Sequence, residues 1–533
     1  MRLTGQRFDV AIIGGGINGV AIARACARSR MRTLLVEQND FASGVTSRST
    51  RIIHGGLRYL QHGELGLVRE SLKERGRMLR EYPHLVRPLK FVLALPRSSG
   101  HSALAIRTGL WLYKNLGRPR VSESESGLEQ LLDREDLATF DYDDAQCEFP
   151  ERLVAEWLSE AVAAGAIVRN HCRALDLTIR DRRVKGLTVR HDLTGEETYV
   201  EAAHVINATG PWADRFAAAA GVNTRQPMLG GLRGSHIVLP RFADAPRSAV
   251  YTEAPDGRPI FVIPWNGQLL CGTTEVPDSG DPERTQPTAQ EISYLLDSVN
   301  RLFPAAQVSA ADILYSFAGI RPLPHAPGSE PAAVTRRHHI RDHADDGARG
   351  LYSIIGGKLT TAASLAREVV RKLGAEVIEP PHALIAPAPA DGIAATLRQW
   401  ARQVSAVAHI PESTAIGIAE WHGRRALCVA RLAATDGFLR QPLCEHSGHI
   451  VAEAVEAARY ECAVTLGDIL LRRVPVALSG CWSPACTQAA ARNIGFALGW
   501  DQRRIALESE RFEQERAAFL VKPAELSRPQ RAA

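Results

Sequence analysis

The chain opens with two short apolar runs that flank a glycine-rich turn and a helical stretch. Residues 8–13 (FDVAII) and residues 32–37 (RTLLVE) have the length and composition of buried parallel strands, and the second run ends in an acid. Residues 19–30 between them are rich in alanine and favour a helix. The pattern predicts strand, turn, helix and strand within residues 8–37, which is the order of one βαβ unit.

A series of short apolar segments follows in the middle of the chain. Turn signals such as Asn266-Gly267 separate them, as is typical of antiparallel strands. We therefore predict an antiparallel sheet inserted into the first domain. Its expected strands cover residues 184–189, 197–200, 205–207, 237–239, 260–263 and 268–271.

The last third of the chain has a different pattern. Residues 352–355 predict one more buried strand, and Gly356-Gly357 then open a helical stretch that runs to residue 373. Residues 379–392 (EPPHALIAPAPADG) are rich in proline and alanine and predict a linker. Helical spacing returns over residues 394–407, 418–434, 451–463 and 503–519. We predict two domains, residues 1–385 and an all-helical domain over residues 390–525.

Composition narrows the class of protein. A chain of 533 residues is too long to fold around one ordinary hydrophobic core, so at least two domains are expected. The content of 45% hydrophobic and 23% charged residues is normal for a globular protein and excludes a disordered one. The net charge of +5 is too small to indicate a nucleic-acid partner. The longest early apolar run, residues 10–23, is interrupted by glycines and is shorter than the ~20 residues that cross a bilayer. No spanning segment is expected.

Nine cysteines are scattered without a CxxC pair. Cys481 and Cys486 are the closest two, and neither a second pair nor a histidine stands near them in the sequence. We therefore expect no disulfide framework and no metal site, and a reducing cytoplasm fits best.

Gly14, Gly16 and Gly19 give the pattern G-x-G-x-x-G between the first strand and the helix. The first glycine permits a tight turn, the second lets a pyrophosphate approach the backbone, and the third lets helix and strand pack closely. The helix N-terminus offers free N–H groups to phosphates. Glu37, at the end of the second strand, is placed to accept hydrogen bonds from ribose hydroxyls. The unit predicts a dinucleotide site.

A second turn of small residues, Asn207 to Trp212 (NATGPW), follows a strand. Beside the first motif it resembles the ATG turn of FAD proteins, so it favours FAD over NAD. Residues 43–51 (SGVTSRSTR) are rich in hydroxyls and arginines, and residues 52–60 (IIHGGLRYL) set a histidine and an arginine in an apolar run. The second segment predicts polar groups directed into a site.

The strings GGGINGVAIAR, DFASGVTSRSTRIIHGGLRYL, HLVRPLKFVLALP, INATGPWAD, IFVIPWNGQLLCGTTEV, AGIRPL and IIGGKLTT resemble the aerobic, FAD-dependent glycerol-3-phosphate dehydrogenase family, in the family's order. TLGDILLRR and GCWSPAC resemble its C-terminal domain. The resemblance implies an α/β fold: an FAD-binding Rossmann-like domain of the glutathione-reductase/D-amino-acid-oxidase type, an inserted antiparallel substrate sheet, and a C-terminal helical domain. It also implies oxidation of sn-glycerol 3-phosphate to dihydroxyacetone phosphate, with electrons passed to a membrane quinone.

The resemblance assigns residues to the site. Four cations, Arg58, Arg321, Arg336 and Lys358, match the active-site cations, and His54, Tyr59, His236 and Thr274 match other pocket positions. Catalytic roles fall to Arg321, His54 and Lys358; the proton acceptor stays open among them. The expected FAD-binding residues are Gly14, Gly16, Asn18, Gly19, Glu37, Ser43, Thr46, Ser47, Ser49, Ala208, Thr209, Gly210, Gly356 and Gly357.

One stretch and one single residue depart from the family pattern, and several alternative functions stay open. Residues 144–153 replace a DDARL-type stretch, and Arg51 stands where lysine is frequent. The rivals are an oxidase that uses oxygen, an amine-oxidising relative, and a non-catalytic FAD-binding protein; the cations argue against the last two. A quinone acceptor implies attachment to the cytoplasmic face of the inner membrane, for which Ile106–Arg120 is the candidate segment. A homodimer is a further open alternative.

Overall fold

The computed structural model describes residues 3–61, 63–97, 102–116, 135–243, 245–328, 334–379 and 392–521. The predicted βαβ unit is confirmed: β1 (Arg7–Ile13), α1 (Ile17–Arg28) and β2 (Thr33–Val36) follow one another, and β1 pairs with β2 in parallel. β9 (Glu197–Asn207) lies parallel to β1 on its other side. This first sheet has the order β16-β17-β9-β1-β2-β6, where β6 is Ile167–Arg169, β16 is His339–Asp342 and β17 is Leu351–Ile355.

Three of the predicted middle strands, residues 184–189, 197–200 and 205–207, belong to this first sheet and not to the inserted one. β7 (Cys172–Arg180) and β8 (Arg183–His191) form a hairpin that extends the sheet from β9. Residues 197–200 and 205–207 are parts of the single strand β9. The prediction was wrong here because a short apolar run indicates a strand but not the sheet it joins. Ala202 within β9 is buried, so the strand continues through the predicted gap.

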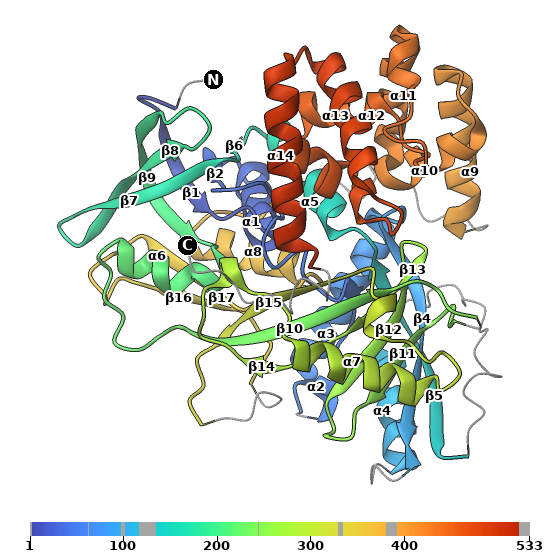
Figure 1. The fold of residues 1–533 in the computed structure, drawn as a ribbon. Helices are drawn as coiled ribbons and strands as arrows, with labels where there is room; N and C mark the ends of the chain where they lie inside the picture. The colour runs from blue at the N-terminus through green and yellow to red at the C-terminus, as the bar shows by residue number, and fades with distance from the viewer. Residues whose placement is uncertain are drawn as a thin grey trace.

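The second sheet is mostly antiparallel and has the order β14-β10-β13-β12-β11-β4-β5-β3, with β15 paired to β10. Its strands come also from residues before 184 and after 271, outside the predicted inserted sheet. One pair in it is parallel, that of β11 with β4. Figure 1 shows it below the first sheet, with α7 along it. Its strands are β3 (Ile52–Ile53), β4 (Val86–Pro96), β5 (Leu137–Cys147), β10 (Leu229–Leu239), β11 (Ala249–Glu253), β12 (Pro259–Trp265), β13 (Gln268–Gly272), β14 (Val276–Pro277) and β15 (Tyr315–Pro324).

Helices from distant parts of the chain cover the two sheets. Trp157 of α5 and Val369 of α8 share one core with Val20 of α1, and this core covers one face of the first sheet. The helices of this part are α2 (Leu57–Gln61), α3 (Leu65–Glu81), α4 (Ala103–Leu116), α5 (Pro150–Ala163), α6 (Ala213–Ala219), α7 (Ala289–Leu302) and α8 (Ala362–Lys372), with short turns η2 (Gly210–Trp212), η3 (Pro282–Arg284) and η4 (Ala310–Asp312).

The C-terminal part is helical, as predicted, and Figure 1 shows it as an orange and red group above the second sheet. The helices are α9 (Gly392–Ala408), α10 (Glu412–His422), α11 (Ala426–Thr435), α12 (Val451–Tyr460), α13 (Pro484–Leu498) and α14 (Gln502–Phe519), with η6 (Gly423–Arg425), η7 (Gly437–Arg440), the π-helical turn η8 (Asp468–Arg473) and η9 (Val476–Leu478). The predicted helix over residues 418–434 is in fact two. Gly423 breaks it with φ of +53°, and a Cβ there would lie 2.7 Å from the ring of His84.

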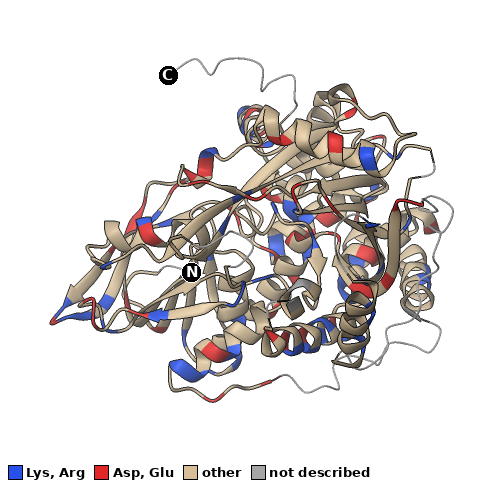
Figure 2. Ribbon diagram, turned by 90° about the horizontal axis from the view of Figure 1, so that it is seen from below, with Lys and Arg blue, Asp and Glu red and all other residues tan. Residues whose placement is uncertain are grey.

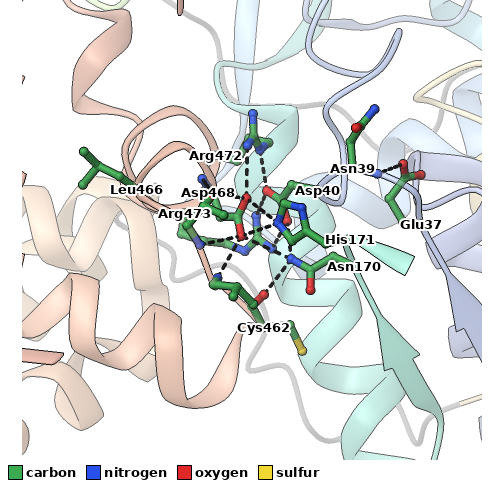
Figure 3. A network of polar contacts seen from close by, with 12 residues as sticks. Glu37, Asn39, Asp40, Asn170, His171, Cys462, Leu466, Asp468, Arg472 and Arg473 are labelled. Atoms are coloured by element: carbon green, nitrogen blue, oxygen red, sulfur yellow. Dashed lines mark hydrogen bonds and ion pairs between the residues drawn. The ribbon is translucent and has the colours of Figure 1, made fainter. Parts of the chain in front are cut away.

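A buried polar network fastens the helical part to the first sheet (Figure 3). Asp40, which follows β2, contacts Arg472 and accepts hydrogen bonds from both terminal nitrogens of Arg473 at 2.7 and 2.8 Å. The His171 ring lies 3.0 Å from a carboxylate oxygen of Asp468. Hydrophobic side chains of the second sheet, such as Phe317, join the same core as Phe512 of α14. The predicted linker, residues 379–392, lies almost wholly outside the described residues, so the predicted domain limits stay a prediction.

Candidate active site

A cavity of about 1100 Å³ opens at the carboxyl ends of the parallel strands of the first sheet. Gly14 follows β1, Glu37 follows β2, Ala208 follows β9 and Gly356 follows β17, and all four line the cavity. Ligands of open α/β sheets bind at this edge. The second sheet supplies a further wall through residues that include His236 and Arg321, and the C-terminal helices supply Arg472, Glu515, Ala518 and Phe519.

The glycines of the first turn are required by close backbone contacts. Gly14 has φ of +105°, and a Cβ on it would lie 2.5 Å from the carbonyl oxygen of Ala208. A Cβ on Gly19 would lie 1.8 Å from the carbonyl oxygen of Gly14. Gly16 has more space, 3.4 Å to the Thr46 hydroxyl, and lines the cavity. Gly19 therefore packs α1 against the turn, while Gly14 and Gly16 face the cavity.

Glu37 is held in one orientation by backbone donors. The Gly15 N–H donates to one carboxylate oxygen at 2.6 Å, and the Asn39 N–H donates to the other at 2.8 Å. Burial raises the pKa of Glu37, and these two hydrogen bonds oppose the shift. The carboxylate lies at the carboxyl end of β2 and lines the cavity.

The hydroxyl-rich segment after β2 lines the cavity, and hydrogen bonds within the segment fix its conformation. Thr46 accepts the Ile17 N–H at 3.1 Å, so it contacts the first turn of α1. Ser47 donates to the Ala42 carbonyl at 2.7 Å, and Ser49 donates to the Thr46 carbonyl at 3.1 Å. The lining also contains Ser43. The two bonded serines shape the segment, while Thr46 orders the helix end.

The turn after β9 closes the same edge. The Ala208 N–H donates to the Ile13 carbonyl at 2.8 Å, and the Thr209 hydroxyl donates to the Asn207 side chain at 2.7 Å. Gly210 has φ of +62°. Ala208, Thr209 and Gly210 all line the cavity, as expected.

Gly356 and Gly357 approach α1 from the opposite side. The Asn18 amide donates to the Gly356 carbonyl at 3.2 Å, and a Cβ on Gly357 would lie 2.5 Å from that amide nitrogen. The Asn18 Oδ1 atom is buried without a hydrogen-bond partner. The two glycines do not open a helix as expected. Their φ values of +73° and +98° are not helical, and α8 begins only at Ala362.

Two arginines of the cavity share one carboxylate. Arg336 pairs with Glu275 at 3.0 Å, and Arg321 lies 3.8 Å from the same carboxylate and donates to the Thr273 hydroxyl at 2.9 Å. Thr273 lines the cavity. The predicted residue Thr274 is buried behind it, where its hydroxyl donates to Glu291 at 2.7 Å.

Lys358 is the third of the predicted cations that line the cavity. Its Nζ lies 3.1 Å from the Ser71 hydroxyl and 4.3 Å from the centre of the Tyr59 ring. Burial lowers the pKa of Lys358 to about 7, two acidic side chains of α3 and its preceding turn oppose the shift, and Arg336 adds to it. The side chain of Arg58, the fourth predicted cation, lies outside the described part of the structure.

The two predicted histidines of the cavity, His54 and His236, are neutral at ordinary pH. Burial, followed by the charges of Lys358 and Arg75, lowers the pKa of His54 to about 3. Burial, followed by Arg321 and Arg51, lowers the pKa of His236 to about 3. The His236 ring nitrogen lies 3.0 Å from the Thr50 hydroxyl.

Comparisons with known proteins agree with this geometry. A family model described as FAD dependent oxidoreductase matches residues 9–372, and one described as the C-terminal domain of alpha-glycerophosphate oxidase matches residues 361–505. A glycerol-3-phosphate dehydrogenase of Synechocystis sp. is 34% identical over 95% of this chain and 96% of its own length. The aerobic glycerol-3-phosphate dehydrogenase of Escherichia coli is 36% identical over 68% of this chain and 73% of its own. The chain belongs to the FAD-dependent glycerol-3-phosphate dehydrogenase family.

A solved structure supports the same assignment over the whole chain. The X-ray structure of the glycerol-3-phosphate dehydrogenase from Bacillus halodurans complexed with FAD has a TM-score of 0.75 at 26% identity, and covers 97% of this chain and 96% of that chain. The cavity suits the cofactor of this dehydrogenase family. Gly14 and Gly19 leave no room for side chains in the turn, α1 begins at a glycine N-cap without an acid in its first turn, and Asn18 has an unpartnered oxygen.

Sequence reasoning missed residues that support the site of this dehydrogenase. The Gly55 N–H, beside His54, donates to the Tyr113 hydroxyl at 2.7 Å and to Asp144 at 3.2 Å. Asp144 also contacts Arg75. Asp144 lies in the stretch that departs from the family pattern, where it carries a supporting role. Glu275 was missed as well, although it follows the Thr-Thr pair in the quoted string GTTEV.

Arg51 belongs to the segment that lines the cavity, but its guanidinium forms a buried ion pair. It is fully buried, pairs with both oxygens of Glu151 at 2.9 and 3.0 Å, and lies 4.5 Å over the Trp265 ring. This fork needs a guanidinium, which accounts for arginine rather than lysine here.

Proposed function

We propose that this protein oxidises sn-glycerol 3-phosphate to dihydroxyacetone phosphate with FAD as hydride acceptor and a membrane quinone as final electron acceptor. The observation that carries the proposal is a cluster of cations, Arg321, Arg336 and Lys358, in the cavity that also holds the dinucleotide turn. A phosphate dianion needs such a cluster, whereas an amine substrate does not. The names of the relatives agree with this substrate.

The cofactor residues follow from the four turns at the sheet edge. We assign the pyrophosphate to Gly16 and the N-terminus of α1, with Gly14 and Thr46 beside it, because a helix N-terminus offers N–H donors and the glycines leave its approach unobstructed. Glu37 is assigned to the ribose hydroxyls, and Ala208, Thr209, Gly356 and Gly357 to the remaining contacts. When bound, FAD accepts the hydride from C2 of the substrate and passes two electrons to the acceptor.

We assign the cations and the histidines of the cavity to different parts of the substrate. Arg336 and Lys358 are assigned to the phosphate, with Tyr59 beside Lys358. Arg321 is assigned to the C2 hydroxyl, where it stabilises the negative charge that develops as the hydroxyl proton passes to water. His54 and His236 are neutral, so each retains a nitrogen that is able to accept a hydrogen bond or a proton. Their low pKa values make them weak bases, and we assign them to positioning the hydroxyl.

The surface of α4 supports the membrane proposal. Leu104 is 76% exposed and Trp111 is 66% exposed, and among the described residues of α4 Tyr113 alone is buried. Ala105 and Ile106 of the same helix line the cavity. An apolar helix surface at the mouth of a redox cavity suits a monotopic contact that admits a quinone from the bilayer. Residues 117–120 of the predicted patch lie outside the described residues. No helix within the described ranges is long and apolar enough to span a membrane.

Charge distribution and assembly complete the proposal. Figure 2 shows positive and negative residues interspersed over both sheets and the helices, rather than gathered into one field. This pattern does not suit a polyanionic partner such as nucleic acid. We propose a location on the cytoplasmic face of the inner membrane, two domains at residues 1–385 and 390–525, and a homodimer as the assembly to examine.

One experiment tests the function directly. The FAD-loaded protein is titrated with glycerol 3-phosphate without oxygen, and the visible flavin band is followed. We expect stoichiometric bleaching with glycerol 3-phosphate and none with glycerol or an amino acid. Oxygen and a soluble quinone analogue are then mixed separately with the bleached protein. Fast return of the band with quinone supports a dehydrogenase, whereas fast return with oxygen and peroxide release would support the oxidase.

The role of Arg321 has its own test. Arg321→Lys and Arg321→Ala should retain FAD yet slow flavin reduction about 100-fold or more in stopped-flow experiments, because one charge-stabilising donor is worth about 10²–10³ in rate. Arg190→Ala is the matched control, since Arg190 is a partly exposed arginine of β8 outside the cavity. Undiminished reduction in both Arg321 variants would remove Arg321 from the reaction.

A further inference from the structure

A group of two thiols and one imidazole lies in the helical domain, away from the cavity. The ligand atoms of Cys444, His446 and Cys486 all lie within 4.8 Å of one another. Cys486 Sγ is 3.7 Å from His446 Nδ1. Cys444 and His446 stand in the loop between η7 and α12, and Cys486 stands in the first turn of α13. None of the three lines the cavity.

The backbone holds these side chains in place. The Leu443 N–H donates to the His449 carbonyl at 2.9 Å, and the Ser447 N–H donates to the Cys444 carbonyl at 3.1 Å, so the loop is a closed turn. Ser483 caps α13 and accepts the Cys486 N–H at 3.4 Å. Both cysteines are buried, at 4% and 3% exposure, while His446 is exposed. The imidazole therefore covers two buried sulfurs from the solvent side.

We propose that Cys444, His446 and Cys486 bind a thiophilic divalent cation of the zinc class. Zinc takes thiolate and imidazole ligands at about 2.3 and 2.0–2.1 Å in a tetrahedron, so its ligand atoms lie about 3.5–3.8 Å apart. The measured sulfur–nitrogen distance of 3.7 Å falls in this range. Calcium and magnesium prefer oxygen ligands, and the group offers sulfur and nitrogen.

The three side chains leave the fourth position of a tetrahedral site to a further ligand. Cys481 is an exposed cysteine in the turn before α13. Either this thiol or a water takes the fourth position. Metal binding would then tie the loop at residues 441–450 to the start of α13. α13 packs with α14 in one core, and α14 reaches the flavin cavity through Glu515 and Phe519.

The sequence offered little sign of this site. Forty residues separate His446 from Cys486, and the spacing Cys444-x-His446 is shorter than the usual paired motifs of zinc proteins. The fold alone brings the two segments together. Our expectation of no metal site rested on the absence of a CxxC pair, which does not exclude ligands assembled from distant segments.

The experiment uses the full-length, FAD-loaded protein, purified under reducing conditions without a chelator. Elemental analysis should give about one zinc per chain. Cobalt(II) loaded in its place should give ligand-field bands of a tetrahedral thiolate site, to the red of the flavin absorption. A strong chelator should lower Tm without releasing FAD at once. A reduced protein that stays metal-free in the presence of zinc or cobalt(II), with Tm unchanged, would overturn the proposal.

Variants separate metal binding from folding. His446→Ala removes an exposed side chain, so the helices should stay folded and hold FAD while zinc affinity falls at least tenfold. Cys486→Ser should abolish the cobalt bands and make Tm insensitive to the chelator. Cys428→Ser is the matched control, because Cys428 is an exposed cysteine of the same domain, and it should leave zinc content and Tm unchanged. Full cobalt spectra in both His446→Ala and Cys486→Ser would contradict the assignment, and so would a Cys444–Cys486 disulfide that forms in place of metal uptake.

Discussion

Lys358 is a cation in surroundings that oppose its charge. Its pKa of about 7 lies well below the ordinary value, mainly because the side chain is buried. At neutral pH the free protein therefore holds Lys358 about half protonated. A bound phosphate dianion favours the charged form, so substrate binding and protonation of this amine are coupled.

This coupling predicts the pH dependence of substrate capture. Lys358 is charged below about 7, and the second ionisation of a phosphate monoester lies near pH 6. The second-order rate of flavin reduction at low glycerol 3-phosphate should therefore peak between about pH 6 and pH 7 and fall as the pH rises further. Stopped-flow rates across pH measure it.

Two variants identify the group that titrates. Lys358→Arg keeps its charge at high pH, so the alkaline fall should move upward by more than one pH unit. Lys358→Met should reduce the rate at every pH. A rate that instead rises through pH 7 in the unmodified protein would assign the neutral amine to proton removal, and an unmoved alkaline fall in Lys358→Arg would exclude Lys358 as its source.

Residue types at the site could be predicted better than the side to which they point. Gly19 was predictable because the local contact with Gly14 depends on the motif alone. Thr274 was predicted to face the substrate, yet its neighbour Thr273 lines the cavity. Adjacent residues face opposite sides, and the side is set by the pairing of this segment with β10, which a single strand does not reveal.

At the scale of elements, α4 has large apolar side chains that are exposed and do not pack into the hydrophobic core. Its two large exposed side chains, Leu104 and Trp111, lie on a helix that also touches the cavity. Leu104→Ser and Trp111→Ser should each weaken binding to anionic vesicles about tenfold or more, because burial of one large apolar side chain contributes about 1.5–3 kcal/mol. Vesicle co-sedimentation at low salt measures the loss.

A control for α4 comes from the helical domain. Phe496 of α13 is 71% exposed, and Phe496→Ser should leave vesicle binding unchanged. Quinone-linked turnover in vesicles should fall with Trp111→Ser, while anaerobic flavin reduction stays constant. Equal binding by all three variants and the parent protein would exclude α4 as the attachment surface.

Elements were predictable where their signal is local. The βαβ unit at residues 8–37 and most C-terminal helices carry their own periodicity, and they formed as expected. Residues 184–189 of β8 were assigned to the wrong sheet, because the pairing of β8 with β9 is chosen by packing and not by the residues of β8 alone. Gly423 was overlooked as a helix break because one glycine is tolerated in many helices.

At the scale of the whole molecule, Asp40 joins the cofactor sheet to the helical domain. It contacts Arg472 and Arg473 across 432 and 433 residues of sequence, and all three side chains are buried. Asp40→Ala leaves two buried guanidiniums without this partner, which should cost about 3–5 kcal/mol of unfolding free energy. Loss of flavin fluorescence quenching and of helical circular dichroism in urea measures the change.

The matched control for Asp40 is a carboxylate on the surface. Asp141 pairs with Lys90 at 3.2 Å and is 66% exposed, so Asp141→Asn should cost less than about 1 kcal/mol. We expect Asp40→Ala to release FAD at a lower urea concentration than either the parent or Asp141→Asn. Coincident release curves would show that Asp40 does not hold the two parts together. No local pattern could have predicted this contact, because its members stand at opposite ends of the chain.

The wall formed by Arg472, Glu515 and Phe519 has a consequence for biosynthesis. The glycine turn at residue 14 leaves the ribosome early, but the last wall residue in the described part of the chain is Phe519. About 500 residues take roughly 25–100 s to synthesise at 5–20 residues per second. The first sheet is complete only after β17 has been made, and the enclosure of the cavity is still missing at that point. We therefore expect tight flavin binding only after translation is complete. Prematurely terminated chains lack this wall and should not retain the cofactor.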